Sequence, residues 1–343
     1  PSQEPERHRD ALDHLQERLE GAGLGCRRHP SRRSLVGRMR GAPVQLLVGH
    51  LDTVWPVGTL EHFPVQRHGD RLSGPGVFDM KAGLVQLVFA LEALRELRLT
   101  PVVSPVVVIN CDEEIGSPRS TPLLARLGRT AVRAFVLEPA LGTSLKTSRK
   151  GGGRFRVHIQ GVPAHAGLNP DRGASAILEL SYVIQDLFAL NDAERGVTVN
   201  VGVVDGGLRP NVVAPHSTAD VDVRVPTQRE AQRVEQAIRS LRPRVPGVRL
   251  KVEGGWGRPP MEATPRNQAL FERARALGAE LGLDLTGAAA GGSSDGNTLS
   301  QHTATLDGLG AVGDGAHSHE EYCLLEPMPV RAALLALLML EPA

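Results

Sequence analysis

The stretch LLVGHLDTVWP, residues 46–56, places two titratable side chains directly after a short apolar run. The run has the length and composition of a buried strand, and His50 and Asp52 stand where that strand ends. In open α/β sheets, ligands bind at the carboxyl ends of the strands. The stretch therefore predicts a site at such an edge, provided that neighbouring strands also end in polar groups.

Other apolar runs alternate with helical patterns along the chain. Residues 106–110 and 134–138 read as buried strands, and residues 84–97 carry leucines at helical spacing. Further helical patterns open the chain and resume at 267–282. Strands that alternate with helices indicate an α/β fold with a mostly parallel sheet.

The middle of the chain has a different pattern. The segments RFRVHI, VTVNVGVV and STADVDVRV alternate as strands of an antiparallel sheet do, with helical patterns between and after them. We therefore expect an α+β module over residues 149–257, inserted into an α/β domain that is formed by residues 1–148 and 258–343. RKGGGR, where this module begins, is expected to be a hinge, and the glycine- and proline-rich EGGWGRPP is expected to close it.

Composition excludes several classes of function. The 343 residues carry 39 basic and 38 acidic side chains, a net charge of +1 that gives no attraction to nucleic acid. No apolar run is long enough to span a membrane. Three widely spaced cysteines argue against a disulfide framework and favour the cytoplasm. The chain starts at Pro1, which leaves a removed export signal open.

Several polar groups follow apolar runs and would converge at one sheet edge. They are His50, Asp52, Asp79, Glu113, Glu114, Glu138 and His317. Two imidazoles with several carboxylates suit a pair of divalent metal ions that share a carboxylate and a water, and Asp79 is the candidate bridge. Such a pair performs hydrolytic chemistry.

The adjacent pair Glu113 and Glu114 could divide two tasks. On an extended segment the two side chains point to different sides, so one can bind metal while the other handles the proton. Asp52 is expected to orient His50 through a hydrogen bond. The alternatives are ordinary: strand-end carboxylates usually serve as caps, and Glu pairs usually lie on solvated surface. His319 is a rival to His317 as a ligand, and Cys111 is expected to be a buried strand cysteine.

Seven motifs together resemble one enzyme family. They are GHLDTVWPVGTL, LSGPGVFDMKAG, INCDEEIGS, FVLEP, GVPAHAG, GGSSDGN and GLGAVGDGAHSHEEY. In this order they are similar to the dizinc family of bacterial glutamate carboxypeptidase, acetylornithine deacetylase and succinyl-diaminopimelate desuccinylase, over nearly the whole chain. The resemblance implies a catalytic domain, residues 1–148 and 258–343, that is interrupted by a lid and dimerisation domain, residues 149–257.

The resemblance also implies a role for each metal-site residue. One zinc ion would be held by His50, Asp79 and Glu138, and the other by Asp79, Glu114 and His317. Glu113 becomes the general base and Asp52 the residue that orients His50. The Asp79–Met80 peptide bond is expected to be cis.

Three lid residues and Arg258, which directly follows the lid, are implied to contact the substrate. The histidine of PAHAG, His165, would reach across a dimer to stabilise the oxyanion, although a turn histidine is the alternative. Asn211, Arg224 and Arg258 would bind the substrate, because a guanidinium can bond both oxygens of a carboxylate. Either arginine could instead form a structural ion pair.

These expectations define an enzyme with two Zn²⁺ per subunit, for which Co²⁺ or Mn²⁺ could substitute. It would act on a small peptide or N-acyl amino acid and release a C-terminal amino acid, as glutamate carboxypeptidases do. It would form a homodimer through the lid, without a nucleic-acid or membrane partner. The first alternative is an N-acyl amino acid deacylase; an alternative of another class is an inactive, metal-stabilised binding protein.

Overall fold

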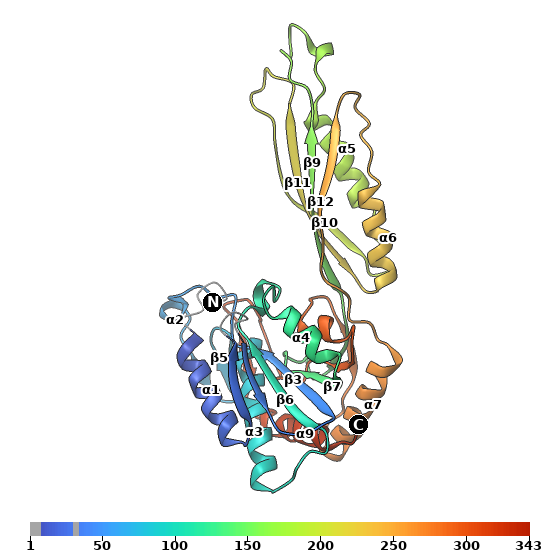
Figure 1. The fold of residues 1–343 in the computed structure, drawn as a ribbon. Coiled ribbons are helices and arrows are strands. Elements are labelled where there is room, and N and C mark those ends of the chain that lie inside the picture. Colours follow the sequence, from blue (N-terminus) through green and yellow to red (C-terminus); the bar gives the residue numbers. More distant parts are fainter. Residues whose placement is uncertain (1–7, 30–33) are drawn as a thin grey trace. The chain divides into compact units, whose positions relative to one another are not determined.

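The computed structural model describes residues 8–29 and 34–343, and the chain folds into two units (Figure 1). The first unit contains the chain up to Arg149, together with Met261–Ala290 and Ser294–Ala343. The second unit consists of Lys150–Pro260 and Gly291–Ser293. The inserted segment thus runs from 150 to 260, against the expected 149–257.

A six-stranded sheet forms the centre of the first unit. Its inner strands β3 and β6 are buried along their whole length, because Val, Leu and Ile fill both of their faces. Strands β6, β3, β7 and β14 pair in parallel, and β2 and β1 extend the sheet antiparallel, so the mostly parallel α/β architecture is confirmed. In spatial order the strands are β1 (Gly25–His29), β2 (Ser34–Arg38), β6 (Ser104–Asn110), β3 (Val44–His50), β7 (Ala131–Val136) and β14 (Ala304–Leu306).

Helices cover both faces of this sheet. Leu47 packs in a cluster with residues of α1, α3, α7 and α9, whereas its neighbour Val48 packs on the other face with residues of α4 and α8. This alternation follows from the two-residue period of a strand. The helices of the first unit are α1 (Arg9–Gly21), α2 (Thr59–His62), α3 (Ala82–Glu96), α4 (Thr121–Gly128), α7 (Pro265–Glu280), α8 (Asp295–Leu299) and α9 (Met328–Leu340).

Two small sheets complete the first unit. One is antiparallel, in the order β15 (Gly313–Asp314), β16 (Tyr322–Leu324), β5 (Arg71–Ser73) and β4 (Gln66–His68). The other pairs β8 (Leu145–Arg149) with β13 (Gly287–Ala290) in parallel. The antiparallel sheet positions the site, because β5 leads into the segment of Asp79 while β15 and β16 flank the segment of His317.

The second unit is an antiparallel sheet with two helices. Its strands, in spatial order, are β10 (Thr198–Gly206), β11 (His216–Val225), β9 (Gly151–Gln160) and β12 (Arg249–Arg258). Apolar residues from one face of the sheet form a core with α5 (Ala176–Phe188) and α6 (Gln228–Arg239).

Two glycine-rich segments differ from expectation. The expected hinge glycines 151–153 lie inside β9, and most of EGGWGRPP belongs to β12. A Cβ at Gly153 would lie 2.9 Å from the ring of Trp256, so this glycine permits close packing within the sheet. The segment is therefore paired strand and not a flexible connection.

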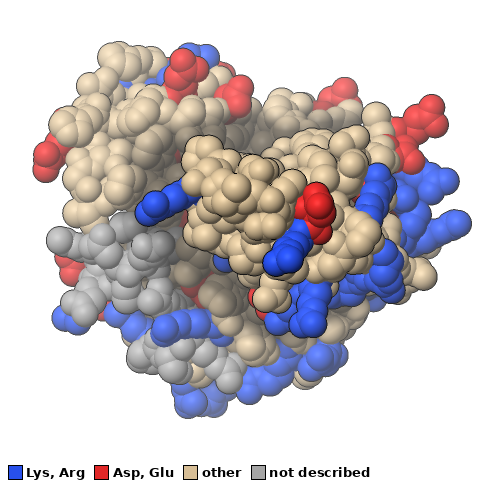
Figure 2. All heavy atoms as spheres, turned by 90° about the horizontal axis from the view of Figure 1, so that it is seen from above, with Lys and Arg blue, Asp and Glu red and all other residues tan. Residues whose placement is uncertain are grey.

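Charged side chains of both signs lie on the surface (Figure 2). On the solvent face of the second unit's sheet they form pairs, such as Arg156 with Asp220 and Lys251 with Glu253. Among the residues that the structure describes, no helix combines the length and the apolar character that crossing a bilayer requires.

Candidate metal centre

His50 ends β3, and both it and Asp52 are about 1% exposed. The Nδ1 atom of His50 lies 3.0 Å from the backbone oxygen of Asp52 and 3.5 Å from its carboxylate. Because Nδ1 faces these acceptors, Nε2 is the nitrogen available to a cation. The Asp52 carboxylate also accepts hydrogen bonds from the backbone N–H groups of Glu113 (3.3 Å) and Glu114 (3.1 Å). Asp52 therefore orients His50 and ties the end of β3 to the segment after β6.

Asp79 lies between two imidazole rings. Its Oδ1 is 3.2 Å from Nε2 of His50, and its Oδ2 is 3.3 Å from Nε2 of His317. Glu138 Oε1 lies 3.4 Å from the same nitrogen of His50, and Glu114 Oε2 lies 3.3 Å from that of His317. The structure thus brings the five ligand candidates together as two sets of three residues that share Asp79.

Glu113 and Glu114 diverge, but for a different reason from the one expected. Residues Glu113–Ile115 form a single helical turn, so the expectation of an extended segment was wrong. Successive side chains on a 3₁₀ turn differ in direction by about 120°. Glu114 consequently faces His317, while a carboxylate oxygen of Glu113 lies within 4.8 Å of ligand atoms of His50 and Glu138.

Topology explains why these residues meet. His50 ends β3, and the Glu113–Ile115 turn and Glu138 follow β6 and β7. These three neighbouring strands run parallel, so their carboxyl ends share one edge. Asp79 precedes α3, and its peptide bond to Met80 is cis, as the resemblance implied. His317 has φ of 64°, a left-handed conformation that is uncommon for a residue other than glycine.

Buried oxygen atoms test whether metal ions fit this centre. Glu114 Oε1 is buried and has no hydrogen-bond partner among the described residues, and Asp79 Oδ1 is buried with the His50 imidazole 3.2 Å away. Such oxygens are costly to bury unless a cation or a donor satisfies them. Imidazole and carboxylate ligands without thiolates suit Zn²⁺, Co²⁺ or Mn²⁺. Cys111 is packed in the apolar core instead, as expected.

The metal-free cluster binds protons strongly. Burial opposes protonation of His50, but the carboxylates of Asp52, Asp79 and Glu138 outweigh it and raise the pKa of His50 well above its usual value. Asp79 and Glu114 raise the pKa of His317 to about 10. A metal ion that binds either imidazole must displace its proton.

Sequence reasoning missed a buried ion pair behind Glu138. Arg149 Nη2 lies 3.4 Å from Glu138 Oε2, and the same guanidinium donates two hydrogen bonds to Asp307, at 2.7 and 3.1 Å. Asp307 also accepts a hydrogen bond from Ser294. Arg149 therefore holds Glu138 in place from behind. The available signal was that Asp307 directly follows β14, a parallel strand of the same sheet as β3, β6 and β7.

His165 and Asn211 lie on adjoining loops of the second unit. The backbone N–H of Ala166 donates to the carbonyl of Asn211 at 3.0 Å. The Nδ1 atom of His165 accepts hydrogen bonds from the backbone N–H groups of Gly167 and Leu168, both at 3.1 Å. This assigns the ring proton to Nε2, which makes the exposed edge of His165 a hydrogen-bond donor.

The two arginines of the second unit differ in their surroundings. Arg224 donates two hydrogen bonds to Asp222, at 2.7 and 3.0 Å, which is the ion pair considered as an alternative. Arg258 is 7% exposed and lies 3.5 Å from the carbonyl oxygen of Ser293.

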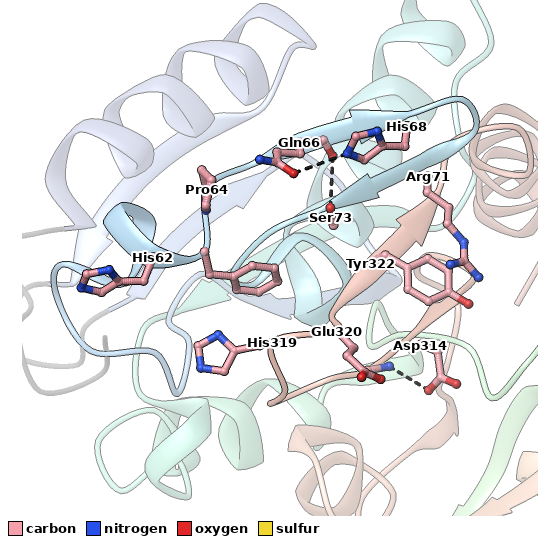
Figure 3. Close-up of a pocket in the computed structure, with 12 residues that line it drawn as sticks. His62, Pro64, Gln66, His68, Arg71, Ser73, Asp314, His319, Glu320 and Tyr322 are labelled. Carbon is pink, nitrogen blue, oxygen red and sulfur yellow. Dashed lines mark hydrogen bonds between the residues drawn. The ribbon is translucent and has the colours of Figure 1, made fainter.

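His319 packs against aromatic rings. Its ring contacts those of Trp55 and Phe63, at centroid distances of 5.0 and 5.5 Å. His319 and Phe63 line an open hollow of about 820 Å³, together with Arg71 and Tyr322 (Figure 3). The residue that faces Asp79 and Glu114 is therefore His317.

Comparison with known proteins agrees with this geometry. The model of peptidase family M20/M25/M40 matches residues 46–341, so the chain belongs to this family of metal-dependent hydrolases. Carboxypeptidase G2 of Pseudomonas sp. (strain RS-16) is 27% identical over 90% of this chain and 76% of its own length. Succinyl-diaminopimelate desuccinylase of Delftia acidovorans is 26% identical over 95% of this chain and 90% of its own length. A dinuclear metal-binding peptidase of the M20 family from Bacillus subtilis shares the fold, with a TM-score of 0.70, 13% identity and coverage of 97% of this chain and 92% of its own.

Proposed function

We propose that this chain is a dizinc amidohydrolase that releases a C-terminal amino acid from a small peptide or an N-acyl amino acid. The observation that carries the proposal is the pair of three-residue sets that share Asp79, with the Glu113 carboxylate beside them. The likeness to carboxypeptidase G2 and to a dinuclear metal-binding peptidase supports it.

The side chains divide the chemistry among them. One ion would be held by His50, Asp79 and Glu138, and the other by Asp79, Glu114 and His317. When bound, such ions polarise the substrate carbonyl and acidify water. Glu113 accepts the proton of the attacking water and passes it to the leaving nitrogen. Asp52 keeps Nε2 of His50 directed at the site.

The second unit supplies substrate contacts in this proposal. The Nε2–H of His165, from the partner subunit of a homodimer, donates to the oxyanion that develops on the carbonyl. Arg258 binds the carboxylate of the leaving amino acid, with Arg224 and Asn211 assisting. Such contacts restrict cleavage to the carboxyl end of the substrate.

Edge strand β10 supports association through the second unit. Among the described residues it pairs with one strand, β11, and the Asn191 side chain bonds the N–H and C=O of Val199 near its start, so the outer edge beyond Val199 can pair with a second chain. Val203 and Val204 on this strand are 60% and 54% exposed, and Leu208 just after it is 65% exposed. We therefore propose a homodimer in which the β10 strands of two subunits meet.

A deacylase that acts on N-acetyl or N-succinyl amino acids is the second candidate. Its support is the desuccinylase relative, which is similar to this chain at nearly the same identity as the carboxypeptidase. Amide cleavage measured on C-terminal glutamyl compounds, N-acetylornithine and succinyl-diaminopimelate separates the two candidates. The proposal of a carboxypeptidase fails if only the acyl compounds are cleaved.

Replacing Glu113 tests the reaction itself. E113Q is expected to keep two bound ions, measured by elemental analysis, while turnover falls by about 10²–10⁴-fold, the usual contribution of a general base. The neighbouring E114Q is the matched contrast and is expected to weaken the binding of one ion. Undiminished hydrolysis by E113Q, with metals bound, would remove this residue from its role.

Mixed dimers test the contribution in trans. A subunit with H165A and a subunit with E113Q should together recover activity, since one of the two sites in such a dimer has both intact groups. No recovery in purified heterodimers would place His165 outside the partner's site.

A further inference from the structure

Glu321 is a fully buried carboxylate that the chemistry above does not use. It lies just before β16 and accepts four hydrogen bonds. Oε1 accepts from the backbone N–H groups of Phe78 (3.0 Å) and Asp79 (3.1 Å). Oε2 accepts from the backbone N–H of Gly76 (2.9 Å) and from Nε1 of Trp55 (3.0 Å). Three of the four donors therefore belong to the segment that ends at the shared metal ligand.

These contacts require a carboxylate. An ionised carboxylate only accepts hydrogen bonds and offers about four acceptor positions, which four N–H donors fill. An amide at the same place would turn an NH₂ group toward two N–H donors, whichever way it is rotated. Glu321→Gln would therefore lose two of the four hydrogen bonds with almost no change in side-chain volume.

The backbone of Glu321 adds a further tie to the same segment. Its carbonyl accepts a hydrogen bond from Gly74 at 3.2 Å, and the next residue, Tyr322, pairs with Ser73 of β5. Tyr322 lines the hollow in Figure 3, beside β5. Hydrogen bonds with Glu321 and Tyr322 thus fix the backbone of residues 73–79, from Ser73 to the backbone N–H of Asp79.

The orientation of Asp79 depends on this fixation. Asp79 adopts φ of −108° and ψ of 95°, which are not helical, although it lies in the turn Val77–Lys81 that leads into α3. Its two carboxylate oxygens must face His50 and His317 at once. The hydrogen bond from the backbone N–H of Asp79 to Glu321 fixes the backbone of Asp79, and so keeps both of its carboxylate oxygens in place.

We propose that Glu321 is the positioning residue of the bridging ligand: through the amides of residues 76–79 it holds Asp79 in the conformation that binds both metal ions. The inference rests on the two-metal site proposed above. Removal of a group that orients a metal ligand commonly costs about 10–100-fold in metal affinity, and we expect a loss of this size in E321Q.

The test compares E321Q with E320Q, the same substitution at the exposed neighbouring residue. Metal-free proteins are titrated with Zn²⁺ against a chromophoric chelator, and the visible spectrum of the Co²⁺ forms is recorded. E321Q should bind the ions about 10–100-fold more weakly and show altered Co²⁺ bands, whereas E320Q should match the unchanged protein. W55F removes only the donor outside residues 76–79 and should also retain metal affinity.

The outcomes separate the two proposals. If the unchanged protein binds no ions, the two-metal proposal fails and this inference fails with it. If it binds two ions and folded E321Q matches E320Q in affinity and Co²⁺ spectrum, only the role of Glu321 is refuted, even where E321Q unfolds at a lower temperature. If E321Q does not fold, the same comparison is made with E321D, which keeps the charge but is one methylene shorter. Unchanged metal affinity of E321D would then refute the role of Glu321.

Discussion

The buried pair of Arg149 and Asp307 permits a direct test of the energetics behind the metal site. Their side chains are 4% and 0% exposed, and two hydrogen bonds join them. R149M keeps an apolar side chain of similar length but leaves the Asp307 charge buried without its cation. Breaking a buried ion pair from one side costs about 3–5 kcal/mol of folding free energy, and we expect R149M to lose that amount.

A matched control comes from the second unit. Arg156 also makes two hydrogen bonds to one aspartate, Asp220, but their side chains are 56% and 38% exposed. Solvent screens that pair, so R156M should be indistinguishable from the unchanged protein. R149M/D307L removes both charges of this pair and should recover part of the loss, because Glu138 still lacks the guanidinium of Arg149.

Urea unfolding of the metal-free proteins measures these differences. The chain has two tryptophans, Trp55 in the first unit and Trp256 in the second, so W256F and W55F backgrounds each report one unit by fluorescence. R149M is measured with Trp55 and R156M with Trp256. A loss for R149M no larger than that for R156M would refute the reasoning from burial.

Two further predictions concern metal ions and protons. In the metal-free protein the raised pKa values keep His50 and His317 protonated at pH 7.5, where an ordinary histidine would be only roughly a tenth protonated. Binding of Zn²⁺ should therefore release about two protons, which calorimetry in buffers of different ionisation enthalpy measures. A release below one proton would contradict the raised pKa values. Removal of the ions with EDTA leaves Asp79, Glu114 and Glu138 close together. Zn²⁺ at about 100 times its Kd should therefore restore about 2.7 kcal/mol for each ion that binds and raise the Tm of the first unit by roughly 5–11 °C per ion. Superimposable melting curves with and without Zn²⁺ would exclude a stabilising site.

The positions of His50, Glu114 and Glu138 could be predicted because parallel strands bring the groups at their carboxyl ends to one edge. Asp79 and His317 do not end parallel strands, since Asp79 lies in the turn before α3 and His317 between the antiparallel β15 and β16, so their placement followed from the resemblance. The contacts behind the ligands could not be predicted in this way. Glu321 lies more than 240 residues from the amides that it holds, and nothing in HEEY distinguishes a buried carboxylate from an exposed one.

Local conformation was harder to predict than residue type. Glu113–Ile115 is a turn and not a strand, and the glycines of RKGGGR are strand residues that permit close packing. A glycine in a sequence is compatible both with a flexible backbone and with close packing against the backbone. At Gly153 the ring of Trp256 shows that close packing is the reason.

The shared position of Asp79 has a consequence for how such a centre can change over evolutionary time. In the proposed two-metal site, a lineage that drifts toward a single-ion enzyme could lose Glu114 or Glu138, since each would serve one ion only. Asp79 would have no such freedom, because its replacement would abolish both proposed ions in one step. Descendants of this chain that retain any metal chemistry should therefore vary at the outer ligands first.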